Sequence, residues 1–599
     1  MEWTRLGLRI SIAGASAVLS SLALGGALKA QTIGTTRAGP PSAATCPGEN
    51  GGLVLSPGFC ATVFADDLGH VRQMVVAPNG TLYVNTWSGR YFKSPPPPGG
   101  FLIALRDTKG DGRADVIERF GVTSESGGTG GTGIAPYENG VYAEENGRIL
   151  RYARIAGEVV PSQAPTVVVS GLPLTGDHPM HPFVIDGKGN LFVDSGSATN
   201  ACQKENRIAG SPGIDPCTEK ATRAGIWRYD ANKSNQAFSP AERYVSGLRN
   251  GEGLAFDAQG RLFATQHGRD QLYQNWPKLY TPEQSADLPA EELVELRPGA
   301  DYGWPECYYD QIQQKLVLAP EYGGDGGKKV EGCAQRQGPV AAFPGHWAPN
   351  ALAIYLGSKF PAGYRGGAFI AFHGSWNRAP LPQGGYNVVF QPMADGKASG
   401  PYVVFADGFA GQYKEPGRAA FRPSGLAVAP DAALYVSDDV HGRIWRITYN
   451  GDGSDKVAPA VAAKSPPSAS ALQANPLPPE GVHPDAGRQA HSLPTPPGAT
   501  PQQVTLGDRI FHGEAANGAC SGCHGSDAGG SPGGPPLNTG HWLWGDGSLA
   551  SLSAIIAKGV PKPRKYEGVM PPMGGSPLSK DQLAAVAAYV WAIGHANDH

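Results

Sequence analysis

The chain has 599 residues, of which 40% are hydrophobic and 17% charged, and its formal net charge is −3. This length exceeds what one hydrophobic core usually organises, so two or more domains are expected. The Lys and Arg residues form no basic stripe interleaved with aromatic residues, so nucleic acid is not an expected partner.

The first 30 residues have the pattern of a secretory signal peptide. Two arginines precede a mildly apolar run over residues 10–28, which ends near the small residue Ala30. An uncleaved membrane anchor is the alternative, because the run is just long enough to span a bilayer, but its Gly and Ser content weakens insertion. We therefore expect a leader over residues 1–30, an extension over 31–50, and a periplasmic or secreted protein with no other membrane association.

A short pattern recurs six times between residues 51 and 453. Each copy combines a short apolar strand, a turn and a second strand of aromatic and β-branched residues, which is typical of antiparallel hairpins. Repeated hairpins over about 400 residues favour radial packing. The sequence therefore predicts an all-β six-bladed β-propeller, followed by a small all-α domain. The copies begin at Gln73, Gly133, Pro182, Gly253, Ala351 and Gly425.

Six of the eight cysteines fall into three locally spaced pairs. In an oxidising compartment this spacing suggests three disulfides, although spacing alone does not establish connectivity. A metal site is the alternative, and it is disfavoured because none of the six lies in a Cys-x-x-Cys step. The pairs are Cys46 with Cys60, Cys202 with Cys217, and Cys307 with Cys333.

Two further motifs in the propeller need separate interpretation. Gly128–Gly133 matches a G-x-G-x-x-G string, but it leads into an extended segment where a dinucleotide site would open a helix, so no nicotinamide site is predicted. Asp107–Asp115 resembles a calcium-binding loop with Lys109 at one ligand position, and it is a candidate structural calcium site.

Equivalent loops of the repeats carry basic side chains. His178 stands four residues before the third copy, Arg249 four before the fourth and Arg422 three before the sixth. Loops in equivalent register should emerge at one mouth of the channel, so these side chains and Arg72 should line one site. A base among guanidinium groups suits oxidation of an alcohol beside an anionic cofactor. Alternatively, His178 and His181 could form a metal pair.

Residues 454–503 are rich in Pro, Ala and Ser and have almost no apolar periodicity, so they are interpreted as an interdomain linker. Residues 504–599 should form the helical domain. Its last segment, Ser579–Gln582, has the pattern of a capping box at a helix N-terminus. Apolar residues then recur at helical spacing, namely Leu583, Val586, Val590 and Ile593.

The segment Cys520–His524 reads Cys-Ser-Gly-Cys-His, a c-type haem attachment motif. The thiols of Cys520 and Cys523 can bond to the two vinyl groups of a haem, and His524 then ligates the iron. A zinc or redox Cys-x-x-Cys is the alternative, and the export signal disfavours it. This motif predicts an exported redox protein.

The sixth iron ligand should come from the segment that folds over the other face of the haem. Met570, which is followed by Pro571, fits the cytochrome c pattern, and Met573 is the second candidate. His541 or His595 would instead imply a lower potential, because Met/His ligation raises it.

Five propeller segments together match the pattern of a known family. The segments are Gly176–His178, Leu248–Leu254, Asp301–Pro305, His373–Arg378 and Arg422–Leu426. They resemble the soluble glucose/sorbosone dehydrogenases, which are six-bladed quinoproteins that use pyrroloquinoline quinone (PQQ) and calcium. The likeness covers roughly residues 51–449, and the fusion to a cytochrome most resembles a sorbosone or pyranose dehydrogenase.

This resemblance implies a role for each matching residue. His178 would be the general base that takes the proton of the substrate hydroxyl. Backbone carbonyls of Gly268 and Arg269 would bind a calcium ion that polarises the quinone. The carboxylates and carbonyls of PQQ would be held by Arg249, Asn250, Arg378 and Arg422.

The sequence departs from the glucose enzyme's pattern at three places. The turn after the fourth repeat reads Gln266–Asp270, Glu252 replaces an amide residue, and Asn377–Arg378 stands where a lysine is usual. These departures concern the residues expected to bind calcium and to set the sugar preference.

The function expected from these features is that of a quinohaemoprotein. The propeller would oxidise an aldose, sorbosone or a related aldehyde or alcohol with PQQ, and electrons would pass to covalently bound haem c and then to an external cytochrome or quinone-linked chain. Two alternatives stay open at this point: a propeller lactone hydrolase with a channel metal, and a non-catalytic carbohydrate-binding propeller joined to an electron-carrier cytochrome.

Overall fold

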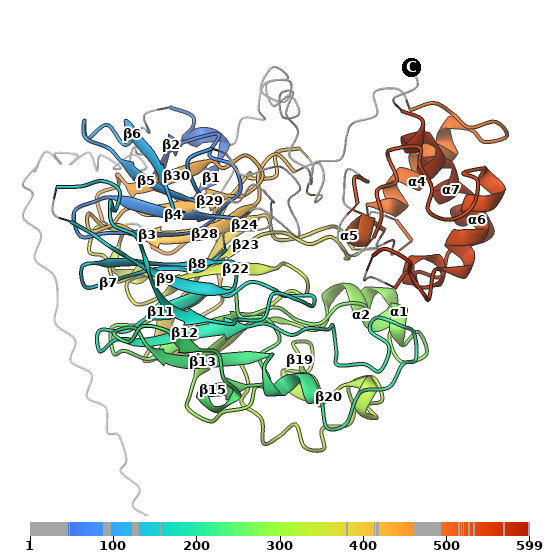
Figure 1. Ribbon diagram of the computed structural model, residues 1–599, viewed down its shortest axis with the longest axis horizontal. Coiled ribbons are helices and arrows are strands. Elements are labelled where there is room, and N and C mark those ends of the chain that lie inside the picture. Colours follow the sequence, from blue (N-terminus) through green and yellow to red (C-terminus); the bar gives the residue numbers. More distant parts are fainter. Residues whose placement is uncertain are drawn as a thin grey trace, which may run out of the picture. The chain divides into compact units, whose positions relative to one another are not determined.

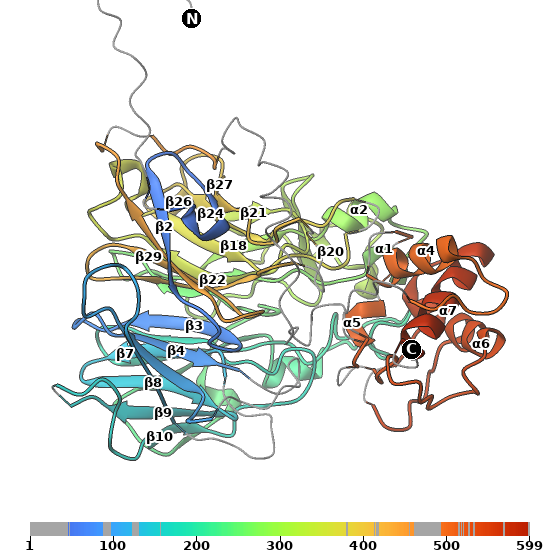
Figure 2. The same cartoon turned by 90° about the horizontal axis from the view of Figure 1, so that it is seen from above.

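In the computed structural model, each of the six repeats folds into the hairpin that its sequence predicts. Six sheets form the blades of a six-bladed β-propeller, drawn from blue to orange in Figures 1 and 2. Within each blade, the repeat supplies the first two strands, and two further strands complete the sheet in four blades and three in the second and fifth. The predicted fold class is therefore confirmed for both domains.

Parts of the chain lie outside the described residues, among them the predicted leader over 1–30, Gly128 to Gly130 of the glycine-rich string and most of the predicted linker. In the part of the chain that is described, no helix combines the length and apolarity needed to cross a membrane. The described residues are 46, 48–87, 98–121, 131–155, 157–378, 381–412, 414, 419–453, 456–460, 493–512, 515–516, 518, 520–524, 528–530, 534–566 and 569–596.

The blades follow one another in chain order. The first contains β3 (Val71–Val76), β4 (Leu82–Thr86), β5 (Leu102–Arg106) and β6 (Val116–Phe120). The second contains β7 (Ile134–Tyr137), β8 (Gly140–Glu145), β9 (Arg148–Ala153), β10 (Thr166–Ser170) and β14 (Gln236–Ala237). The third contains β11 (Phe183–Ile185), β12 (Asn190–Ser195), β13 (Gly225–Asp230) and β15 (Arg243–Ser246).

Of the remaining three blades, the fifth and sixth also contain a strand from the N-terminal end of the propeller sequence. The fourth contains β16 (Leu254–Phe256), β17 (Leu262–Gln266), β18 (Glu291–Leu296) and β21 (Ala341–Phe343). The fifth contains β22 (Pro349–Ile354), β23 (Ala368–Phe372), β24 (Asn387–Gln391), β27 (Val403–Asp407) and β1 (Val54–Leu55). The sixth contains β28 (Pro423–Val428), β29 (Leu434–Asp438), β30 (Ile444–Tyr449) and β2 (Phe59–Ala65).

The ring is closed by its N-terminal strands. β2 pairs antiparallel with β30, so the sixth blade contains strands from both ends of the propeller. β1 extends the fifth blade by pairing with β27. The predicted Cys46–Cys60 disulfide ties the segment before these strands to β2, and the Cys202–Cys217 and Cys307–Cys333 disulfides also form as predicted.

Hydrophobic clusters lie between neighbouring blades. The largest joins the fifth and sixth blades through an aromatic group in which Phe59 packs edge-on against Phe360, Tyr364 and Phe405 at centroid distances of 4.7, 5.2 and 4.8 Å. Similar clusters fill the other five interfaces. Burial of these faces, worth about 25 cal/mol per Å² of apolar surface, holds the blades together.

A polar side chain on the second strand of most blades bonds to the backbone that enters the next blade. The fifth blade is the exception, because its second strand has Ala371 in place of a polar residue. There, Arg422 of the next blade donates to the His373 and Gly374 carbonyls across the interface. The bonds are Asn85 Nδ2 to Gly133 O (2.9 Å), His181 N to Glu144 Oε2 (3.1 Å), Gly251 N to Asp194 Oδ1 (3.1 Å), Thr265 Oγ1 to Pro349 O (2.8 Å) and Ser437 Oγ to Arg72 O (2.8 Å). These bonds fix the loops that enter each blade.

Two insertions carry the remaining disulfides. One follows β12 and contains Cys202–Cys217. The other lies between β18 and β21, contains Cys307–Cys333 and forms the hairpin of β19 (Cys307–Asp310) and β20 (Lys315–Leu318). The helices α1 (Leu272–Asn275) and α2 (Pro282–Asp287) lie in a separate insertion between β17 and β18. A further short hairpin pairs β25 (Met393–Ala394) with β26 (Lys397–Ala398).

The C-terminal helices, red in Figure 1, form the predicted all-α domain. α7 starts with the predicted capping box, because the Ser579 side chain accepts from the backbone of Gln582 and the Gln582 side chain accepts from that of Ser579. Val586 and Val590 of this helix belong to the domain core. The helices are α4 (Pro501–Phe511), α5 (Cys520–His524), α6 (Leu549–Lys558) and α7 (Lys580–Gly594).

The described ends of the predicted linker belong to folded structure. Ala460 N donates to Val404 O at 2.7 Å, and Val457 packs against the core between the fifth and sixth blades. At the other end, Thr500 caps α4, which begins at Pro501. The segment that connects the two domains is therefore shorter than the linker over residues 454–503 that the composition predicts.

Candidate functional site

Four residues selected from the repeat register line one cavity of the propeller. Arg72, His178, Arg249 and Arg422 all contribute to its wall, from the first, third, fourth and sixth blades. Each lies in the loop that enters its blade or at the start of the first strand, so equivalent register places them at one mouth of the ring. Asn250 and Gly268 line the same cavity.

His178 is held as a neutral imidazole with a defined tautomer. Its Nδ1 lies 2.9 Å from the carbonyl oxygen of Ser197 and 3.0 Å from Oγ, while Ser197 Oγ donates to Thr199 O at 2.7 Å. Both Ser197 atoms are therefore acceptors, so Nδ1 carries the hydrogen and Nε2 has a lone pair. Burial and the positive charge of Arg249 lower the pKa of His178 to about 3. The imidazole is thus uncharged at neutral pH.

Gly196 makes room for two site residues. A Cβ at this position would lie 2.6 Å from His178 Cβ and 2.7 Å from Asn250 Oδ1. Any larger residue would displace the side chains of His178 and Asn250, which explains why a glycine directly follows β12. Asn250 Oδ1 is buried and has no hydrogen-bond partner among the described residues, so it is an acceptor available to a bound molecule.

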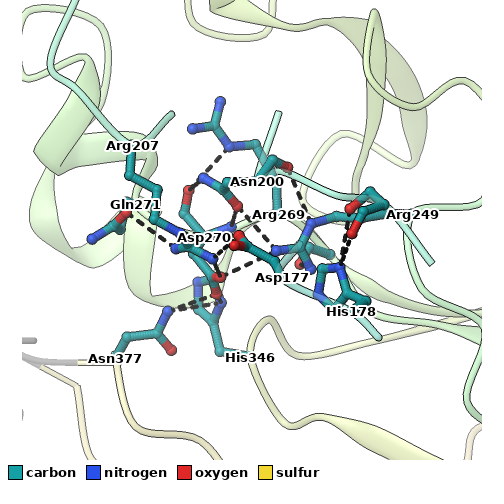
Figure 3. A network of polar contacts seen from close by, with 12 residues as sticks. Asp177, His178, Asn200, Arg207, Arg249, Arg269, Asp270, Gln271, His346 and Asn377 are labelled. Carbon is teal, nitrogen blue, oxygen red and sulfur yellow. Dashed lines mark hydrogen bonds and ion pairs between the residues drawn. The ribbon is translucent and has the colours of Figure 1, made fainter. Parts of the chain in front are cut away.

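Asp270 connects several cations of the site (Figure 3). Its Oδ2 lies 3.2 Å from Nη2 of both Arg207 and Arg249, and its Oδ1 accepts from Asn377 Nδ2 at 3.0 Å and lies 3.6 Å from His346 Nδ1. Although burial opposes ionisation, His346 and the two guanidinium groups hold the pKa of Asp270 well below its usual range. Asp270 is therefore a buried anion that fixes its neighbours.

The sequence reasoning did not select Arg207, Asp270 or His346. Asp270 and His346 flank the large insertion, and Arg207 lies in the loop closed by Cys202–Cys217. Arg207 and Asp270 occupy no equivalent position in the repeats, so register could not find them, whereas His346 lies in the loop that enters the fifth blade, five residues before the fifth copy, and register could have selected it. For Asp270, the available signal was the charged pair Arg269–Asp270 beside the Gly268 turn.

A second cluster surrounds Asp439. Arg72 Nη1 and His373 Nε2 lie 2.5 and 2.8 Å from its two carboxylate oxygens. Burial lowers the pKa of His373 to about 4, with a further contribution from Arg422. Glu252 lies 3.7 Å from Arg72 Nη2, and burial raises the pKa of its carboxyl. The cluster therefore presents guanidinium groups beside neutral histidine.

Arg378 does not line the cavity, whereas its neighbour Asn377 does. The Arg378 guanidinium donates to the carbonyls of Ala286 (2.7 Å) and Gly345 (2.6 Å) and to Asp287 Oδ1 (3.2 Å). It therefore anchors the insertion that carries α2.

The Gly268–Arg269 turn has oxygen donors next to a buried acid. Gly268 O accepts from Arg249 Nη1 at 2.8 Å, and Gly268 N donates to Glu291 Oε2 at 2.9 Å. Burial raises the pKa of Glu291 to about 7. The Arg269 side chain pairs with Glu321 at 2.5 Å, away from these donors. A carbonyl and a carboxylate suit a hard cation such as calcium.

Two other candidate metal sites make contacts within the protein. His181, which with His178 forms the alternative metal pair, is buried and pairs through Nδ1 with Glu144 Oε1 at 2.8 Å, and its Nε2 has no hydrogen-bond partner among the described residues. In the Asp107–Asp115 loop, Asp107 accepts the N–H groups of Gly110 and Gly112, at 2.6 and 2.7 Å. Among the described residues, the one group of three His, Cys, Asp or Glu close enough to share an ion is Cys202, Cys217 and Glu219, and those two cysteines form a disulfide.

In the C-terminal domain, α5 brings Cys520, Cys523 and His524 to one cavity wall. His524 Nδ1 lies 2.9 Å from Pro535 O and donates to it, an arrangement in which Nε2 is the nitrogen that would ligate a metal. Met570 lines this wall and pairs through its backbone with Val560, with N to O distances of 2.8 and 3.2 Å.

The alternative sixth ligands are placed differently. His541 also lines the cavity wall, whereas Met573 and His595 are not among its lining residues. His595 Nδ1 lies 2.8 Å from Trp591 O, and its ring stacks on the Trp591 indole. The sixth ligand stays a prediction, with Met570 as the first candidate, Met573 as the second, and His541 or His595 as the alternatives.

Comparison with known proteins divides the chain in the same way. A family described as TrAA12-like matches residues 53–450, and the cytochrome c family matches residues 504–594. The PQQ-dependent pyranose dehydrogenase of Coprinopsis cinerea is 29% identical over 234 residues, which cover 34% of this chain and 30% of that protein. The cbb3-type cytochrome c oxidase subunit FixP of Rhizobium etli is 42% identical over 81 residues, 12% of this chain and 26% of that protein.

Solved structures agree on the fold of the propeller. The holo PQQ domain of the Coprinopsis cinerea pyranose dehydrogenase superposes with a TM-score of 0.53 at 19% identity, and it covers 67% of this chain and 98% of that domain. A Trichoderma reesei protein of carbohydrate-active enzyme family AA12 has a TM-score of 0.52 at 19% identity, covering 66% of this chain and 98% of that one. The matched segments thus span under a third of the length of the two curated relatives, whereas the solved domains are covered almost completely.

Proposed function

Because the chain belongs to the TrAA12-like family and carries a cytochrome c domain, we propose that it is a periplasmic or secreted quinohaemoprotein dehydrogenase. The propeller uses PQQ to oxidise an aldose, sorbosone or a related aldehyde or alcohol. Electrons then pass one at a time to haem c and on to an external cytochrome or quinone-linked chain. The predicted leader and the three disulfides support export.

The observation that carries this proposal is the neutral His178 among guanidinium groups. Its Nε2 takes the proton of the substrate hydroxyl, and Ser197 keeps Nδ1 protonated so that Nε2 stays the acceptor. PQQ, when bound, would supply the two-electron acceptor for the hydride that leaves the carbon bearing this hydroxyl. Oxidation of the hydroxyl-bearing carbon to a carbonyl releases two protons and two electrons: His178 takes one proton, and the quinone would carry the second proton with the two electrons, releasing it as the electrons pass on.

The basic side chains of the cavity fit an anionic quinone. Arg249 and Arg422 would hold its carboxylates and carbonyls, and the orphaned Asn250 Oδ1 would accept a hydrogen bond from it. Neutralising Arg249 in this way would raise the pKa of His178, because Arg249 is the main charge that lowers it. The resemblance gave Arg378 a direct contact, and its observed bonds support an indirect role through the insertion.

Calcium is proposed at the Gly268–Arg269 turn, where both backbone carbonyls would ligate it. Arg249 donates to the Gly268 carbonyl. The guanidinium would therefore have to turn from this carbonyl toward the quinone as the ion binds. Calcium and PQQ binding should consequently be cooperative, which isothermal titration of the apoprotein with each alone and with both together would measure.

In the cytochrome domain, we propose that Cys520 and Cys523 bond covalently to haem, with His524 and Met570 as axial ligands. The Pro535 carbonyl orients His524. The apolar side chains of Val586 and Val590, which belong to the core of this domain, would pack beside the porphyrin. Met/His ligation would give the haem a high potential, which suits an acceptor of electrons from a reduced quinone.

The test is the haem absorbance of the purified protein, loaded with calcium and PQQ and mixed with a panel of aldoses and sorbosone. Haem reduction that needs both PQQ and a sugar is expected. His178→Ala should slow it about 100- to 10,000-fold, the range for loss of a general base, while PQQ affinity stays within about threefold. Arg154→Gln is the control, because this arginine directly follows β9 of the second blade and does not line the cavity. If no sugar reduces the haem and PQQ does not bind, the proposal fails.

A further inference from the structure

One loop supports three separate parts of the candidate site. It follows β12, and the Cys202–Cys217 disulfide closes it. Ser197, where the loop starts, accepts from His178, and Asn200 accepts from Arg249 Nη2 at 3.0 Å and from the backbone N–H of Asp270 at 2.8 Å. Further along, Arg207 contacts Asp177 and Asp270.

Arg207 bridges the segment that carries the proposed base and the turn proposed to hold calcium (Figure 3). Its Nε and Nη2 donate to Asp177 Oδ2 at 3.2 and 2.9 Å. The same Nη2 lies 3.2 Å from Asp270 Oδ2, and Nη1 donates to Gln271 Oε1 at 3.2 Å. Asp177 precedes His178 directly, so a shift of this carboxylate moves the imidazole with it.

The backbone at Arg207 is held in an unfavourable conformation. Its φ of 62° lies in the left-handed region, which costs free energy for a residue with a side chain. The loop enforces it, because Arg207 N donates to Gln203 Oε1 at 2.9 Å and Ile208 N donates to Glu205 O at 3.2 Å. Strain that a disulfide-closed loop maintains beside a site points to a positional requirement.

We propose that Arg207 is a positioning residue of the dehydrogenase, which fixes His178 through Asp177 and registers it against the Gly268–Gln271 turn. This inference rests on the proposed function. The guanidinium does not touch the substrate in this role. Only a planar fork can reach all three acceptors at once, so a lysine of equal charge cannot replace it.

The charge of Arg207 and the geometry of its hydrogen bonds predict different effects on His178. The effect of charge on the pKa of His178 can be measured in the apoprotein. The groups that face His178 are Arg249, Asp177, Ser197 and Arg207, with His267 also nearby. Arg207 lowers the pKa of His178 and Asp177 raises it. Arg207→Gln should therefore raise this pKa and Asp177→Asn should lower it further, whereas Arg207→Lys should leave it near the wild-type value.

The experiment measures the pKa of His178 by deuterium exchange at the imidazole C2 carbon, resolved by peptide mass spectrometry, and kcat and KM for the sugar that reduces the haem. All three variants should lower kcat at least tenfold with KM within about threefold. Arg154→Gln, whose guanidinium donates to the Glu138 carbonyl at 2.7 Å, is the control and should change neither quantity.

Two results would overturn the proposal. In the first, kcat and the pKa of His178 stay within error of wild type in Arg207→Gln and Asp177→Asn. In the second, the pKa rises toward its ordinary value in all three variants, which would mean that the loop merely shields the imidazole from water. Because the pKa is measured without PQQ or sugar, failure of the proposed function leaves this part of the test intact.

Discussion

The haem site and the propeller site are built in opposite ways. The haem attachment residues Cys520, Cys523 and His524 lie within one short helix, α5. The propeller cavity instead draws side chains from residues as far apart as Arg72 and Asp439. A contiguous site depends mainly on local chain geometry, whereas an assembled site requires every blade to be in register. Sequence changes should therefore affect the two sites independently.

Removing the haem attachment should give the largest effect. The Cys520→Ser/Cys523→Ser variant cannot form thioether bonds, so haem absorbance after denaturation and extraction should fall to background. Sugar-dependent reduction of a soluble artificial dye by the PQQ-loaded propeller should remain within about threefold of wild type, because neither cysteine belongs to the proposed PQQ site. A dye activity that disappeared together with the haem would show that the two sites are not independent.

A smaller effect concerns Asp194, one of the second-strand polar side chains that bond to the backbone entering the next blade. Asp194 is fully buried, its Oδ1 accepts from Gly251 N, and its Oδ2 has no hydrogen-bond partner among the described residues. Burial, together with the nearby Glu252, raises the pKa of Asp194 well above its ordinary value. A carboxyl with a raised folded-state pKa costs stability progressively as pH rises above the unfolded value. Asp194→Asn should therefore gain about 1–3 kcal/mol at pH 8 and nothing near pH 3.

Asp186, in the turn of the same hairpin, provides a control of opposite sign. Its carboxylate accepts the N–H groups of Lys188 and Asn190, both at 2.8 Å, and its pKa is lowered: burial opposes ionisation, but bonds from Asn190 outweigh it. Its contribution is present above the unfolded pKa and is lost as pH falls. Asp186→Asn should thus be less stable than wild type at pH 8. Thermal unfolding of the propeller from pH 3 to 8 measures both, and parallel curves would refute the assignment of Asp194.

The fold was largely readable because hairpins repeat. The alternation around each turn predicted six pairs of first and second strands, and all six are present. Register also predicted that His178, Arg249, Arg422 and Arg72 would meet at one cavity. It could do so because residues at equivalent repeat positions are related by the rotation of the ring.

Register could not reach residues in the insertions. Arg207 and Asp270 enter the site from loops whose path depends on disulfides and long-range bonds, not on local periodicity. Arg378 shows the reverse failure, because its motif was recognised but its guanidinium bonds to the Ala286 and Gly345 carbonyls. Direction of a side chain within a loop is decided by such partners, which one sequence does not reveal.

The smallest predicted effect uses one motif that occurs in both domains. A capping box starts α7 at Ser579 and another starts α2 at Thr281 in the propeller insertion. Each cap satisfies one backbone N–H, so replacing Ser579 or Thr281 with Ala should cost about 1 kcal/mol. If the domains unfold independently, Ser579→Ala lowers only the transition followed by haem absorbance and Thr281→Ala only the transition followed by propeller tryptophan fluorescence. A shift of both transitions in either variant would mean that the two domains are thermodynamically coupled, and that the contiguous haem site depends on the assembled one after all.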